Sequence, residues 1–176
     1  MKEFKLLLIN PRKLIAGVAE ETIANNTLII ILFFTLISVY IQSGSFDYSS
    51  IMAVLKIAAI FIITIIMVLV LIVLRSQILN WAASLFKKSD EVKNIRFAIS
   101  YSMFPLVFAL IIWSWASSSI LWLAILIVLL LWSYLILTLM LSELKKINHL
   151  HAIFSILIAD AILALPIILI SLIFQS

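Results

Sequence analysis

Residues 97–142 decide the fold, and they read FAISYSMFPLVFALIIWSWASSSILWLAILIVLLLWSYLILTLMLS, without a single charged side chain. One straight helix over this stretch would extend about 70 Å at 1.5 Å per residue. The hydrocarbon core of a bilayer is only about 30 Å thick. We therefore predict two membrane spans here, at 97–115 and 120–141. Three consecutive serines, flanked by tryptophans that favour the membrane interface, mark the bend between them.

The composition of the whole chain also indicates a lipid environment. Of its 176 residues, 66% are hydrophobic and 11% are charged. A water-soluble domain of this length would need more charged surface, so we expect an integral membrane protein. Cysteine is absent, which excludes disulfides and thiolate metal sites. The formal net charge of +4 comes from basic residues beside apolar spans, so nucleic acid is not an expected partner.

Three further apolar stretches complete a predicted all-α fold, an integral membrane bundle of five transmembrane helices. They cover residues 27–42, 51–74 and 152–174. The helical pattern of the second continues beyond its membrane part, through RSQILNWAASLF. The predicted domains are a cytoplasmic segment at 1–26 and a five-span transmembrane domain at 27–176.

Basic residues segregate to one side of this five-span arrangement. They precede the first span and lie between spans two and three and between spans four and five. The exception is Lys56, whose stem is long enough to reach the outer interface. By the positive-inside rule we expect an N-inside, C-outside multi-pass protein of the cell membrane. Four or six spans would break this segregation.

The N-terminal stretch NPRKLIAGVAEETIANN has a helical pattern of a different kind. Asn10 can cap a helix, and Pro11 suits its first turn. Apolar residues then recur at roughly helical spacing, with charged residues elsewhere. We predict an N-terminal amphipathic helix on the inner membrane surface. The alternative is that this stretch is the cytoplasmic start of the first span.

Asp160 is the strongest functional candidate, because an acid inside a span costs several kcal/mol unless it is paired or hydrated. It lies about 10 Å below the inner interface, judged by the helical rise. Polar residues of spans three and four at similar depth are predicted to surround its carboxyl: Tyr101, Ser102, Tyr134 and Thr138. Such a cluster could carry ions. Alternatively, Asp160 is a hydrogen-bonded packing residue that joins helices.

The stretch ISYSMFPLVF, residues 99–108, adds a helix-breaking proline to the third span. Pro105 is predicted to kink the helix and to free the carbonyl of Tyr101. In lipid that carbonyl needs a partner, which nearby serines or another helix can supply. We therefore expect a kinked, polar-lined section in the inner half of the bundle.

The motifs of common enzymes and metal sites are missing from the sequence. It contains no His-Glu-x-x-His, no phosphate-binding glycine loop and no Gly-x-Ser-x-Gly. His149 and His151 form a His-x-His pair in a polar loop, which is a weak metal signal. We expect no enzyme, no metal site and no cofactor. Only two glycines are present, so close interfaces of small residues are not expected either.

Three segments of the chain resemble the Yip family, the small five-span proteins named for interaction with Ypt/Rab GTPases. INPRKLIAGVAEE resembles the opening of prokaryotic members, and AISYSMFPLVF resembles the Tyr-Ser-x-x-Pro section of the third span. LWSYLILTLMLSELKKINHLHAIFSILIADAILALP resembles the fourth span, cytoplasmic loop and fifth span. The resemblance implies a non-enzymatic membrane protein that organises or assists others. Its expected partners are the lipid bilayer and other membrane proteins, or further copies of itself.

One departure from the family pattern concerns the N-terminus. Eukaryotic members begin with a long polar cytoplasmic region that is involved in contacts with GTPases, whereas only residues 1–26 precede the first span here. This departure argues against GTPase binding and favours a prokaryotic-type member. The rival functional hypothesis is a transport or channel component that uses Asp160.

Overall fold

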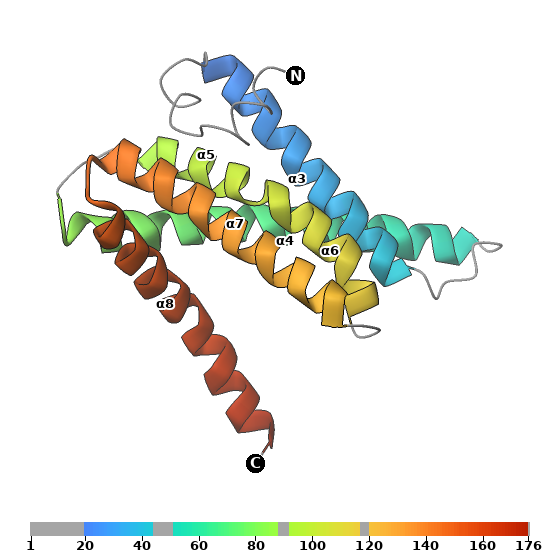
Figure 1. The fold of residues 1–176 in the computed structure, drawn as a ribbon. Coiled ribbons are helices and arrows are strands. Elements are labelled where there is room, and N and C mark those ends of the chain that lie inside the picture. The colour runs from blue at the N-terminus through green and yellow to red at the C-terminus, as the bar shows by residue number, and fades with distance from the viewer. Residues whose placement is uncertain (1–19, 44–50, 88–91, 117–119, 176) are drawn as a thin grey trace.

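The computed structural model describes residues 20–43, 51–87, 92–116 and 120–175. The predicted all-α fold is confirmed for these residues, where every regular element is a helix (Figure 1). The part of the predicted surface helix before residue 20 and the predicted bend at 117–119 lie outside them, whereas residues 20–26 of that predicted helix form the start of α3. The helices, in chain order, are α3 (Glu20–Ser43), α4 (Ile51–Ser84), α5 (Val92–Ser102), α6 (Phe104–Ala116), α7 (Ile120–Lys145) and α8 (His149–Gln175).

Several of these helices have the length and composition of membrane spans. A fifth apolar stretch, Thr27–Ile41 in α3, is shorter than the rest. The helices therefore form a bundle suited to a membrane, while the number of crossings and their orientation stay predictions. The four stretches that are long and apolar enough to cross a bilayer are Ile51–Ser84, Ile95–Trp113, Ile120–Lys145 and His149–Pro166.

The third predicted span is divided at Met103, which separates α5 from α6. The backbone N–H of Met103 donates to the carbonyls of both Ile99 (3.2 Å) and Ser100 (3.1 Å). Pro105, two residues later, has no N–H and occupies the first turn of α6, where that loss is tolerated. The interruption thus falls at the Ser-Tyr-Ser and proline section of the sequence.

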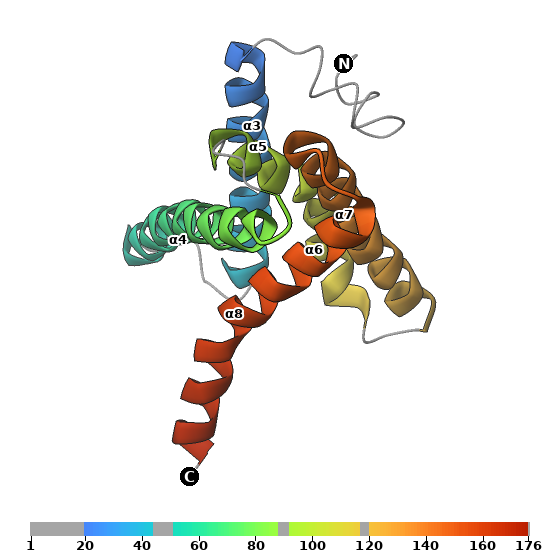
Figure 2. The same ribbon diagram turned by 90° about the vertical axis from the view of Figure 1, so that its left-hand side faces the viewer.

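The helices pack with α7 along α5 and α6, and with α3 against α4 and α6. α8 packs against α4 and α7, but over only part of its length. Figures 1 and 2 show the C-terminal half of α8 extending away from the other helices. Leu165 and Ile168 in this part of α8 are each 56% exposed. In a membrane these side chains would face lipid or another protein.

The buried core lies where α4 and α7 finish and α5 and α8 begin, which we call the inner end. Small side chains are completely buried there on α4 and α8: Ala82, Ala83, Ala152, Ser155 and Ala159. The expectation that two glycines leave no close interface of small residues is therefore wrong. Alanine and serine do here what glycine does in other membrane bundles, since both let helix backbones approach.

Contacts between chain segments tie the inner end together. The ammonium of Lys145, a side chain that is 1% exposed, donates to Oδ1 of Asn80 at 2.5 Å. The rings of Phe86 and His151 stack with centroids 4.5 Å apart. Lys146 follows α7 with a φ of 50°, in the left-handed region that commonly ends helices. Lys145 and Lys146, two of the basic residues that were predicted to lie on one membrane side, belong to this inner end.

Candidate functional site

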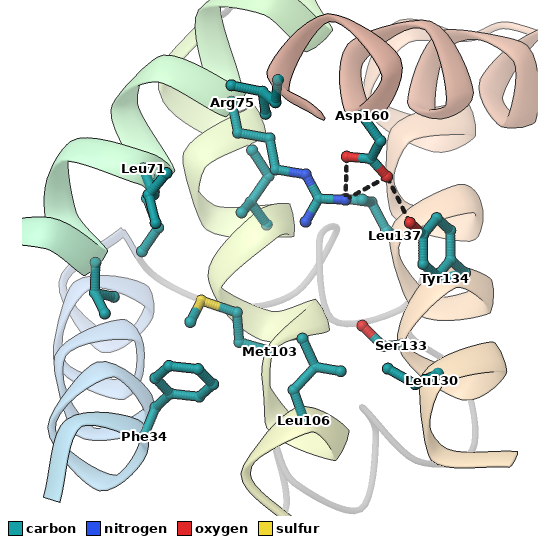
Figure 3. A pocket seen from close by; sticks show the side chains of 14 residues that line it. Phe34, Leu71, Arg75, Met103, Leu106, Leu130, Ser133, Tyr134, Leu137 and Asp160 are labelled. Carbon is teal, nitrogen blue, oxygen red and sulfur yellow. Dashed lines mark hydrogen bonds and ion pairs between the residues drawn. The ribbon is translucent and has the colours of Figure 1, made fainter. Parts of the chain in front are cut away.

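Asp160 of α8 forms an ion pair with Arg75 of α4. Nη2 of the guanidinium lies 2.9 Å from Oδ1 of the carboxylate, and it donates to Oδ2 at 3.1 Å (Figure 3). The two side chains are 22% and 26% exposed, so the pair is mostly withdrawn from its surroundings. Each charge compensates the other, which removes most of the cost of placing an acid within an apolar bundle.

Tyr134 of α7 completes the cluster. Its hydroxyl donates to Oδ2 of Asp160 at 2.6 Å, so the carboxylate accepts from two helices other than its own. We refer to Arg75, Tyr134 and Asp160 as the polar triad. The triad links α4, α7 and α8 at one point, and short hydrogen bonds to a charged acceptor are stronger than neutral ones.

The antiparallel packing of α4 and α8 sets this register. Phe86 stacks on His151 near the inner end, and Arg75 meets Asp160 further along both helices. Ala82 of α4 and Ala159 of α8 are completely buried, and small buried side chains let neighbouring helices come close.

A cavity of about 410 Å³ opens beside the polar triad. Figure 3 shows the triad at one end of the cavity and apolar side chains around the rest of it. Each of the described helices, α3 to α8, contributes to the lining. It consists of Phe34, Val68, Leu71, Ile72, Arg75, Ile99, Met103, Leu106, Leu130, Ser133, Tyr134, Leu137, Asp160 and Leu163.

The polar end of the cavity lies close to the inner boundary of the predicted membrane. The helical rise places Arg75 about 36 Å from Ile51, at the start of α4. That length exceeds the hydrocarbon core of about 30 Å. Arg75 therefore lies near one end of the part of α4 that a bilayer could cover, and the cavity extends from its guanidinium along α7 to Leu130.

Comparison of the sequence with known families identifies the family of the chain. The family described as "Yip1: Yip1 domain" matches residues 5–172, nearly the whole chain. The chain belongs to the Yip family. Comparison with curated proteins and with solved structures gives no match. Together with the apolar helices, this makes the chain a multi-pass transmembrane protein of a family that is generally non-enzymatic.

Of the polar residues predicted around Asp160 in this Yip family protein, Tyr134 bonds to the carboxylate. The others lie elsewhere. Tyr101 is buried in the core with its ring edge-on to Phe97, at a centroid distance of 4.4 Å. Thr138, one turn from Tyr134 on α7, lines a second cavity between α7 and α8. Depth in the membrane was the basis of the predicted grouping, and depth does not determine which face of a helix a residue occupies.

Ser102 and Pro105 belong to the helix interruption of this Yip family protein. The hydroxyl of Ser102 donates to the carbonyl of Ile99 at 2.7 Å. Its own carbonyl accepts from the hydroxyl of Ser133 on α7 at 2.6 Å. A neighbouring helix thus supplies a partner for backbone near the proline, one residue from the carbonyl of Tyr101 that the sequence identified.

Sequence reasoning missed two residues of this Yip family site, Arg75 and Ser133. Arg75 had been assigned to the cytoplasmic end of the second span, as one basic residue among several that set the orientation. The signal that could have found it is its position just past an uninterrupted apolar run, at a depth that Asp160 can reach. Ser133 carried no distinguishing signal, because helical serines usually bond within their own helix.

Proposed function

We propose that this Yip family protein is a non-enzymatic accessory protein of the cell membrane that binds other membrane proteins. The observation that supports the proposal is that the C-terminal half of α8 departs from the bundle (Figures 1 and 2). Exposed apolar side chains cover this part of the helix: Ile162, Leu165, Ile168 and Leu172. Helices associate in lipid through packing rather than through a hydrophobic drive, so a projecting helix offers a surface for a partner helix.

Crosslinking from the projecting part of α8 tests this proposal. A photoreactive phenylalanine analogue at Leu165 or Ile168 would be activated in native membranes, and crosslinked proteins would be identified by mass spectrometry. The matched control places the same group at Val128, an exposed residue of α7 (61%). We expect discrete protein adducts from α8 and lipid adducts from α7. Lipid adducts alone at all three positions would contradict the proposal.

The rival function is a transport or channel component that uses Asp160, and one observation favours it. The carboxylate lines the cavity and is 26% exposed, so an ion could reach it. The ion pair with Arg75 weighs against this function, because a carrier of protons or cations needs an acid that changes partners. For these reasons we assign Asp160 to helix association.

Flux measurements separate these two functions. Asp160→Asn keeps hydrogen-bond acceptance from Arg75 and Tyr134 but removes the titratable carboxyl. Proton and cation flux would be compared between wild-type and variant protein in proteoliposomes. We expect no flux above protein-free vesicles in either case. A flux that the wild type supports and the folded variant loses would establish the transport function instead.

A further inference from the structure

The guanidinium of Arg75 is only partly used by the polar triad. Both contacts to Asp160 are made by Nη2. Among the described residues, no hydrogen bond is recorded for Nε or Nη1. Figure 3 shows a second terminal nitrogen of Arg75 directed into the cavity, above Met103 and Leu106. This nitrogen, Nη1, carries two N–H donors, which suit the oxygens of a phosphate.

The cavity combines these free donors of Arg75 with an apolar interior. Beyond the triad, its lining is aliphatic or aromatic apart from Ser133, whose hydroxyl is already bonded to Ser102. Its volume of about 410 Å³ lies in the range of sites for small ligands, about 300–1,000 Å³. Such a site fits a molecule with one anionic group and one long apolar chain.

The direction of the cavity matches that of a lipid in the inner leaflet. In the predicted orientation Arg75 lies about 36 Å along α4 from its outer start. Its guanidinium meets Asp160, whose predicted depth is about 10 Å below the inner interface. The lining on α7 runs from Leu137 beside the triad to Leu130, which is further toward the outer side. A ligand with its phosphate at Arg75 would therefore point its chain toward the middle of the bilayer, as inner-leaflet lipids do.

We propose that the cavity binds one phospholipid of the inner leaflet, with its phosphate at Arg75 and one acyl chain among α4, α6 and α7. The phosphate accepts from the N–H groups of Nη1, while Nη2 stays on Asp160. Asp160 opposes this binding, since its negative charge offsets that of the guanidinium. Removing the charge of Asp160 should therefore strengthen lipid binding, whereas removing the charge of Arg75 should weaken it. In a purely structural pair, both changes would weaken lipid binding alike.

Native mass spectrometry of the detergent-purified full chain tests the site, with dioleoylphosphatidylglycerol as the added lipid. We expect the wild type to retain one phospholipid and to bind one equivalent after delipidation. Arg75→Gln should bind about ten-fold more weakly, as the loss of charge-assisted phosphate contacts predicts. Asp160→Asn should bind at least as tightly as the wild type, because the guanidinium charge is then no longer offset.

A second variant, which leaves the triad intact, tests the site even where Arg75→Gln fails to fold. Leu130→Trp would fill the apolar part of the cavity and should abolish the single bound lipid. Its matched control is Val128→Trp, an exposed change on the same helix outside the lining, which should retain the lipid. A wild type with only a graded series of weak lipid adducts would overturn the proposal. Equal lipid binding by the two tryptophan variants, or equal weakening by Arg75→Gln and Asp160→Asn, would overturn it too.

Discussion

Nη2 of Arg75 lies 2.9 Å from Oδ1 of Asp160, although 85 positions separate the two residues in the chain. This pair joins α4 to α8, whose C-terminal half extends away from the other helices (Figure 1). Beyond Asp160, α8 exposes Ile162, Leu165, Ile168 and Leu172. The pair and the small residues beside it therefore determine how firmly α8 is held.

Removing the carboxylate of Asp160 should destabilise the protein, and the size of the loss should depend on the replacing side chain. We expect Asp160→Ala to lower the free energy of unfolding by about 1–3 kcal/mol. This loss is below the about 3–5 kcal/mol for a fully buried pair, because both side chains are partly exposed. Asp160→Asn should cost less, because its amide oxygen still accepts from Tyr134. Thermal unfolding in detergent measures both, with the exposed Lys56→Gln as control, and equal losses for Ala and Asn would contradict this expectation.

The buried face of α8 should not accept a larger side chain. Ala159 on α8 is completely buried, and overpacking typically costs about 1–3 kcal/mol. We expect Ala159→Leu to lower the Tm clearly. Ala161→Leu makes the same change at an exposed position two residues away and should leave the Tm almost unchanged. Similar Tm values for the two variants would show that α8 is not packed closely at Ala159.

The helix interruption at Met103 should resist straightening. Pro105→Ala restores a backbone N–H and favours a continuous helix, so the isolated segment would gain helicity. The packed protein should lose stability, because Ser133 bonds to the carbonyl of Ser102 in the interrupted geometry. We expect Pro105→Ala to lower the Tm, and Tyr101→Phe to lower it by less. A higher Tm for Pro105→Ala would mean that α7 does not depend on the interruption.

The predicted orientation can be tested with fusions to a topology reporter. The segregation of lysine and arginine predicts that a reporter after Ser176 is active outside the cytoplasm. A reporter inserted after Lys87, between α4 and α5, should show cytoplasmic activity. Cytoplasmic activity at both sites would rule out the five-span orientation.

Sequence patterns predicted the helices better than the contacts between them. Long charge-free runs require helices in lipid, so the all-α bundle followed directly. Asp160 and Tyr134 were grouped because antiparallel spans bring residues of equal depth together. Arg75 was not included in this group because its charge was interpreted only as a mark of the cytoplasmic side. One residue can both mark that side and pair with an acid. Tyr101 has a suitable depth but faces Phe97, and only three-dimensional packing determines that face.

A double-mutant cycle on Arg75 and Asp160 tests the central claim that these two residues bind α4 to α8. Unfolding free energies would be measured in detergent for the wild type, Arg75→Gln, Asp160→Asn and the double variant. We predict that the double variant loses less unfolding free energy than the two single variants lose together. The difference, the coupling energy, should be about 0.5–3 kcal/mol for residues in direct contact. Additive losses, with no coupling, would contradict the claim.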